Sequence, residues 1–131
     1  MKLLLDTHIW IWALNQPGQL SAKVRRALRK PANQLYLSPV SIWEARHLER
    51  CGRIRLRQPF DLWVRKTLER SPLQEAPFTL AVATAAAMIE LPQPDPGDVF
   101  LAATAITFGL TLVTADRQLM GCPGLSVLDN E

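Results

Sequence analysis

Cysteine is scarce in this chain: Cys51 and Cys122 stand alone among 131 residues. Without a CxxC pair or a cysteine cluster, neither a disulfide framework nor a zinc site is indicated. Long apolar runs are missing too. The longest, at residues 80–91, contains Thr84 and Glu90 and falls well short of the roughly 20 residues that a membrane-spanning helix needs. We therefore expect no membrane segment and a location in the cytoplasm.

The composition is typical of a globular protein, with 48% hydrophobic and 21% charged residues. A chain of this length usually forms one domain, so we assign residues 1–131 to a single domain. Its charge is unevenly distributed. Residues 1–70 contain 14 Lys and Arg against 5 Asp and Glu, whereas residues 71–131 contain 1 against 7, so the net charge of +3 combines halves of +9 and −6. This asymmetry predicts a basic surface that binds a polyanion.

Short apolar segments alternate with longer amphipathic segments along the chain. The predicted strands cover residues 2–5, 34–38, 74–77, 111–116 and 125–129. The predicted helices cover residues 7–14, 21–30, 39–52, 59–70, 80–91 and 95–109, with a brief helical turn at 117–120. Strands that alternate with helices are typical of right-handed crossovers. We therefore predict an α/β fold, a three-layer sandwich with a central, mainly parallel sheet.

Several carboxylates fall where such a fold gathers its functional loops, at the carboxyl ends of the strands. Asp6 follows the first predicted strand, and Asp116 ends the strand at residues 111–116. Asp95 and Asp98 begin a helix that runs back to the start of a strand, so they reach the same edge. Glu44 lies roughly 8 Å from the start of its helix, on the apolar side.

Taken singly, these residues have simpler interpretations. Each aspartate could cap the helix that follows it, and Glu44 could be a buried carboxylate paired with Arg46 or Arg50. Their convergence favours another hypothesis, because carboxylates gathered in a partly dry cleft raise each other's pKa unless a cation compensates. Oxygen donors without cysteine suit Mg²⁺ or Mn²⁺ better than zinc.

An acidic metal site beside a basic surface indicates metal-assisted hydrolysis of phosphodiester bonds. In such a reaction the ion activates water and stabilises charge on the phosphoryl oxygens. Because water and not a ribose 2′-hydroxyl would attack, we expect products with 5′-phosphate and 3′-hydroxyl ends.

Four segments, spread in order over nearly the whole chain, resemble one known family: LLLDTHIWIW, LSPVSIWEA, PDPGDVFLAATA and LTLVTADRQL. Together they are similar to the PIN-domain ribonucleases, and specifically to the VapC-type toxins of bacterial toxin–antitoxin pairs. The resemblance implies an endoribonuclease that depends on Mg²⁺ or Mn²⁺. It also implies a homodimer and a cognate antitoxin that fills the active-site groove and silences the enzyme.

The resemblance places the catalytic site on four carboxylates: Asp6, Glu44, Asp98 and Asp116. It implies that Asp6, Asp98 and Asp116 bind the metal, while Glu44 binds a metal or positions the attacking water. Thr114 is the implied hydroxyl neighbour of this site, and Asp95 is an implied helper.

The chain departs from the resemblance at two positions. Similar toxins often have Arg directly after the aspartate that aligns with Asp98, and a basic residue one turn after the glutamate. Here these positions hold Val99 and Leu48. We therefore expect contacts to RNA from other residues: Arg46, His47, Arg50 and Arg117.

The four tryptophans allow two interpretations. Trp10, Trp12, Trp43 and Trp63 could stack on unpaired bases, but their apolar helix neighbours favour core or dimer-interface positions. The function has alternatives as well. One is a catalytically silent RNA-binding or regulatory PIN-like protein. Another is a phospho-receiver signalling domain, which is disfavoured because it requires a late lysine and the chain has none after Lys66.

Overall fold

The computed structural model describes residues 1–93 and 95–131. Pro94, the first residue of one of the four matching segments, lies outside the described residues. The strands are β1 (Lys2–Leu5), β2 (Gln34–Leu37), β3 (Leu73–Glu75), β4 (Thr111–Thr114) and β5 (Ser126–Asp129). The helices are α1 (Thr7–Asn15), η1 (Pro17–Gln19), α2 (Ala22–Arg29), α3 (Pro39–Arg50), α4 (Phe60–Arg70), α5 (Leu80–Ala87), α6 (Pro96–Phe108) and α7 (Arg117–Met120). None of these described helices has the length and apolar character to cross a membrane.

Capping residues in the sequence explain several helix boundaries. The side chain of Ser21 accepts a hydrogen bond from the N–H of Val24 at the start of α2. Ser38 does the same for the N–H of Val40 at the start of α3. Gly109 ends α6 with φ at 65°, a left-handed conformation that glycine adopts without a steric penalty.

Several predicted boundaries are wrong. The strand predicted at residues 111–116 ends at Thr114, so Asp116 lies beyond β4 instead of ending it, and the helix predicted at residues 39–52 ends at Arg50. The helix predicted at residues 80–91 ends at Ala87, and the strand predicted at residues 74–77 is β3, which begins at Leu73. Pro92 disfavours helical backbone in the residue before it. The helix ends earlier still, where the N–H groups of Met88 and Ile89 donate to the carbonyls of Ala85 and Ala86 in a tightened last turn. The bounds of β3 follow from its pairing with β2, which runs from Leu73 opposite Leu35 to Glu75 opposite Leu37.

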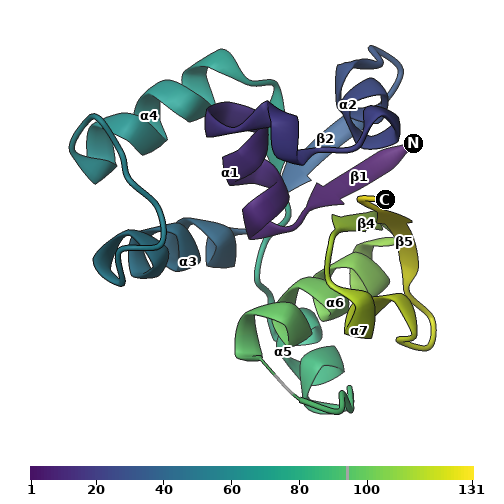
Figure 1. The fold of residues 1–131 in the computed structure, drawn as a ribbon. Helices are drawn as coiled ribbons and strands as arrows, with labels where there is room; N and C mark the ends of the chain where they lie inside the picture. Colours follow the sequence, from purple (N-terminus) through teal and green to yellow (C-terminus); the bar gives the residue numbers. More distant parts are fainter. Residues whose placement is uncertain (94) are drawn as a thin grey trace.

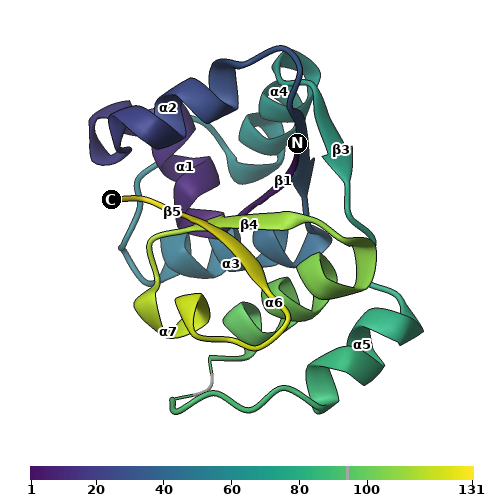
Figure 2. The same ribbon diagram turned by 90° about the vertical axis from the view of Figure 1, so that its right-hand side faces the viewer.

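The strands form a five-stranded sheet in the order β3-β2-β1-β4-β5 within the described residues. All four neighbouring pairs are parallel. Figure 1 shows α1, α2 and α4 on one side of the sheet and α5, α6 and α7 on the other. Figure 2, turned by 90°, shows β4 and β5 crossing above α6 and α7. The predicted three-layer α/β fold is confirmed.

Alternate leucines of β1 pack against the helices on opposite faces of the sheet. Leu3 and Leu5 belong to a cluster with residues of α1, α2, α3 and α4, whereas Leu4 packs with residues of α6 and α7. β4 repeats the pattern, with Val113 in the first cluster and Leu112 in the second. Successive side chains of a strand point to opposite faces, so a central parallel strand reads as a continuous apolar run. This packing fixes β1 and β4 side by side.

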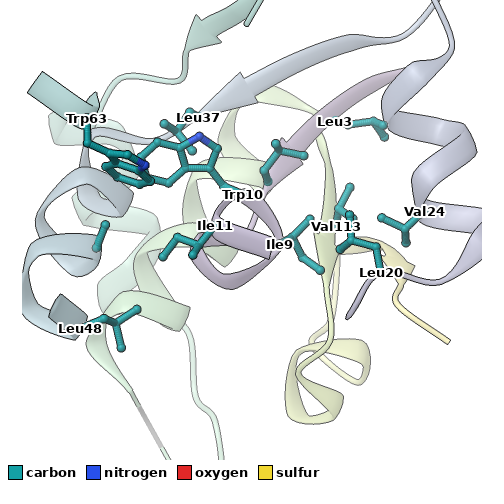
Figure 3. Packing of buried hydrophobic residues seen from close by; sticks show 12 residues of the cluster. Leu3, Ile9, Trp10, Ile11, Leu20, Val24, Leu37, Leu48, Trp63 and Val113 are labelled. Atoms are coloured by element: carbon teal, nitrogen blue, oxygen red, sulfur yellow. The ribbon is translucent and has the colours of Figure 1, made fainter. Parts of the chain in front are cut away.

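The larger cluster contains two tryptophans that lie next to each other, as Figure 3 shows. Trp10 of α1 and Trp63 of α4 are buried, and their ring centroids lie 5.1 Å apart at 50°. Burial of a ring of this size contributes about 4 to 6 kcal/mol. The pair therefore anchors α4 against α1 and, through α1, holds the first turn after β1 in place.

Candidate active site

A cleft of about 1100 Å³ opens at the carboxyl edge of the sheet. Five carboxylate side chains line it: Asp6, Glu44, Asp95, Asp98 and Asp116. They come from the segments that follow β1 and β4, from the second turn of α3 and from the start of α6. The structure thus brings together all four carboxylates that the resemblance places in the catalytic site, together with the helper Asp95.

Asp6 stands between β1 and α1. Its backbone N–H donates to the carbonyl of Val113, which extends the pairing of β1 with β4 by one residue. Its side chain makes no capping hydrogen bond to α1, and only 8% of the residue is exposed. Instead, the hydroxyl of Thr114 donates to Asp6 Oδ2 at 2.6 Å. The capping interpretation is therefore wrong for Asp6.

Asp116 and Asp95 do cap their helices. Asp116 Oδ1 accepts from the N–H of Gln118 at 3.0 Å, and Asp95 Oδ1 accepts from the N–H of Gly97 at 2.9 Å. Each carboxylate has a second oxygen for other contacts. Because both residues also line the cleft, capping orients their side chains and does not exclude a role in the site.

Glu44 is held by two neighbours from other elements. The hydroxyl of Thr7 donates to Glu44 Oε1 at 2.7 Å and also forms a hydrogen bond with Ser41 Oγ at 2.8 Å. Gly97 lies directly against the same carboxylate: a Cβ at this position would be 2.1 Å from Glu44 Oε2. The alternative of an ion pair with Arg46 is wrong, because that guanidinium pairs with Glu49.

Three carboxylates of the cleft have a raised pKa. Burial raises the pKa of Asp6 more than its hydrogen bond from Thr114 lowers it. Burial also raises the pKa of Glu44, and the charges of Asp6 and Asp95 add to the effect. Burial, a hydrogen bond with Asp116 and the surrounding negative charges raise the pKa of Asp98 to about 8. The cleft is thus a place where negative charge is crowded and poorly solvated.

The donor set fits a hard divalent cation. It consists of carboxylate oxygens, which Mg²⁺ and Mn²⁺ prefer, and a cation would relieve the repulsion that raises these pKa values. Among residues 1–93 and 95–131, no group of three His, Cys, Asp or Glu side chains has the positions needed to bind one metal ion. Binding of one ion through three of the carboxylates would therefore require side-chain rotation.

Residues 3–120 match the PIN domain. The chain belongs to the PIN-domain family. This PIN domain is 33% identical over 118 residues to Ribonuclease VapC22 of Mycobacterium tuberculosis. The aligned residues cover 89% of this chain and 88% of that protein. The predicted resemblance to VapC-type proteins is confirmed. The same match removes the phospho-receiver interpretation.

Solved structures share the fold of this PIN domain. It is similar to VapBC2 from Rickettsia felis bound to a DNA fragment from their promoter, with a TM-score of 0.74, 18% identity and coverage of 100% of both chains. It is also similar to DNA-bound VapBC from Salmonella typhimurium, with a TM-score of 0.67, 17% identity and coverage of 98% of both chains.

A second, basic cavity of about 940 Å³ adjoins the acidic cleft of this PIN domain. It lies between α1, α4 and the loop that joins α3 to α4. Five cationic side chains line it: Arg53, Arg55, Arg57, Lys66 and Arg70. None of them takes part in an ion pair among the described residues. His8, Trp12 and Arg53 line both cavities, so the two form one continuous depression.

The residues predicted to contact RNA are placed differently from one another. His47 lines the acidic cleft. Arg46 points to Glu49 and lies over the ring of Phe60, away from the residues that line the cleft. Arg50 and Arg117 are exposed, and Arg117 contacts Glu131 at 3.1 Å. Their role in RNA binding stays a prediction.

The core position is wrong for one tryptophan, and the dimer-interface alternative for it stays a prediction. Trp10 and Trp63 are buried and Trp12 is half-buried, but Trp43 is 67% exposed. The buried side of α3 is formed by Ser41, Ala45 and Leu48, and residue 43 lies on another side of the helix.

Sequence reasoning missed three residues that build the Glu44 site: Thr7, Ser41 and Gly97. Two weak signals were present. Thr7 directly follows Asp6, and Gly97 directly precedes Asp98, so each adjoins a residue that was identified. Nothing local indicates that both positions meet Glu44, since these contacts need the assembled α1, α3 and α6.

Proposed function

We propose that this PIN domain is a metal-dependent endoribonuclease toxin that a cognate antitoxin inhibits. The observation that carries the proposal is the convergence of Asp6, Glu44, Asp98 and Asp116 in one cleft. Burial and crowded charge raise the pKa of three of them, Asp6, Glu44 and Asp98. Groups with strongly perturbed pKa values in a cleft are typical of functional sites. The 33% identity to Ribonuclease VapC22 supports RNA as the substrate.

In this proposal Asp6, Asp98 and Asp116 hold Mg²⁺ or Mn²⁺, and Glu44 holds a metal or orients the attacking water. When bound, the cation would stabilise charge on the phosphoryl oxygens and acidify a water. Thr114 fixes the orientation of Asp6 by donating to one of its oxygens.

Glu44 is oriented by a separate set of contacts. Thr7 donates to one of its oxygens, while Gly97 leaves room for the other. Asp95 contributes indirectly, because its capping bond fixes the position of Gly97.

The basic cavity supports a polyanionic substrate. Its five cations are free of protein carboxylates within the described chain and lie beside the acidic cleft. A strand that passes from one cavity to the other would place several phosphates on the arginines and one at the carboxylates. Phosphate contacts of this kind position a nucleic acid without reading its sequence.

The inhibitor and the assembly state are also part of the proposal. The two solved structures described above that share the fold are VapBC complexes, which supports an antitoxin partner for this chain. We propose that the antitoxin covers the acidic cleft, that the toxin is a homodimer and that the pair acts in the cytoplasm. Sedimentation of the purified toxin tests the dimer.

The nuclease proposal is tested with a mixed pool of small RNAs, the purified protein and Mg²⁺ or Mn²⁺. We expect discrete fragments with 5′-phosphate ends, and no cleavage with EDTA or with Asp6→Asn. A cyclic phosphate end would contradict the hydrolytic route. If the wild type and Asp6→Asn were equally inactive, the catalytically silent alternative would replace the proposal.

A further inference from the structure

Trp43 is an exposed aromatic residue at the acidic cleft. It directly precedes Glu44 on α3 and lines the same cleft as the four carboxylates. The residue is 67% exposed, whereas Trp10 and Trp63 are buried in the core. Its side chain therefore contributes little to the packing of the fold. A large exposed aromatic ring beside a proposed active site is a candidate for contact with a ligand.

The indole is held in a defined orientation. The imidazole of His47, one turn further along α3, stacks on it with the ring centroids 5.3 Å apart and an angle of 7° between the planes. Because His47 covers one face, the indole presents its open surface as a flat shelf. We call these two residues the Trp43–His47 shelf. Both side chains line the cleft.

We propose that the Trp43–His47 shelf stacks an unpaired nucleobase next to the phosphodiester that is cut. This inference rests on the proposed nuclease function and names its substrate class, RNA that is single-stranded at the cleavage point. Base–aromatic stacking tolerates every sequence, since each base has a π-face. A base inside a duplex has both faces covered by its neighbours and could not use the shelf.

The charges around the shelf favour a nucleotide over an apolar protein segment. The cleft continues into the basic cavity through Arg53, whose guanidinium is not paired with a carboxylate in the described chain. A nucleotide presents a flat apolar base and a negative phosphate together. It therefore complements a depression that combines an aromatic shelf, arginines and a site for cations.

The test is the affinity of short RNAs in the Asp6→Asn background, which removes the proposed cleavage and one negative charge. Fluorescence anisotropy compares a labelled single strand of mixed sequence with a duplex of the same length. We expect Trp43→Ala to weaken binding of the single strand by between about 5-fold and about 100-fold and to leave the duplex unchanged. Trp43→Phe keeps a ring and should retain most of the affinity.

Leu80→Ala is the matched control, since Leu80 is a large apolar residue that is 88% exposed and lies on α5, away from the cleft. Its affinity for RNA should equal that of the background. The circular dichroism melt of each variant checks folding, which a change at an exposed side chain should leave intact.

Two results would overturn the proposal. One is an equal effect of Trp43→Ala on the single strand and the duplex, or no effect on either. The other is an unchanged affinity together with a change in the sedimentation of the protein, which would assign Trp43 to an interface between subunits. If the single strand binds through Trp43 but the wild type cuts no RNA, the nuclease proposal fails while the stacking site stands.

Discussion

The hydroxyl of Thr114 donates a hydrogen bond to Asp6 Oδ2 at 2.6 Å, across 108 residues of sequence. The hydroxyl oxygen of Thr114 in turn accepts a hydrogen bond from the N–H of Asp116 at 3.0 Å. One side chain thus ties the end of β1 to the end of β4. It also fixes the positions of two proposed metal ligands, Asp6 through its carboxylate and Asp116 through its backbone N–H.

We predict that Thr114→Val lowers cleavage and Mn²⁺ affinity by about 10- to 100-fold, the usual effect of losing a residue that orients a metal ligand. Stability should fall by about 1 to 3 kcal/mol, because Asp6 loses its donor in a buried place. Thr114→Ser should restore most of both. Thr104→Val is the control, since Thr104 is equally buried but donates only to the carbonyl of Phe100. Equal losses in the two valine variants would reject the orienting role.

The contact between Gly97 and Glu44 gives a second prediction. A Cβ at position 97 would meet Glu44 Oε2 at 2.1 Å, so Gly97→Ala must displace the carboxylate from Thr7. Because the end of a flexible side chain moves, stability should fall by only about 1 kcal/mol, while cleavage should fall at least 10-fold. Gly121→Ala is the control, since nothing lies within 4 Å of its added Cβ. Normal cleavage by Gly97→Ala would show that Glu44 is dispensable.

Addition of metal should stabilise the protein. At a Mn²⁺ concentration about 100 times Kd, binding to the folded state alone contributes about 2.7 kcal/mol. Asp6→Asn should lose most of the resulting rise in Tm, and EDTA should reverse it in the wild type. Asp61→Asn is the matched control, because Asp61 is an exposed residue of α4 outside the cleft. A Tm rise that survives in Asp6→Asn would mean that the metal binds elsewhere.

Without metal, stability should fall as pH rises. The pKa of Asp98 is about 8 in the folded protein and near 3.8 in the unfolded chain. Between these values the folded state retains a proton that the unfolded state has lost, so the free energy of unfolding decreases from about pH 4 to about pH 8 and then levels off. Asp98→Asn should flatten this profile in urea titrations with EDTA. A wild-type profile that rises over this interval contradicts the assignment.

The basic cavity should determine the salt dependence of RNA binding. Replacing Arg53, Arg55 and Arg57 with Gln should reduce the slope of log affinity against log salt by about 0.7 for each single-strand phosphate contact that is lost. The loss should not depend on the sequence of the RNA. The control replaces Arg26, Arg29 and Lys30, which are exposed at the end of α2. Equal slopes for both triple variants would remove the cavity from the binding path.

The sequence by itself determined the layers of the fold and the edge on which the site lies. A continuous apolar run such as residues 2–5 predicts a buried parallel strand, and the strand order within a crossover fold places Asp6 and Asp116 at one edge. These are local patterns combined with a general rule of topology, so they need no knowledge of side-chain contacts.

Only the tertiary structure decided what each side chain does there. Sequence could not tell that Asp6 is no cap, that Thr7 and Gly97 meet Glu44, or that Trp43 faces solvent. Each of these facts depends on residues far apart in the chain that meet only when α1, α3 and α6 pack at the end of the sheet. Burial and hydrogen-bond partners arise from that packing, and no local pattern encodes them.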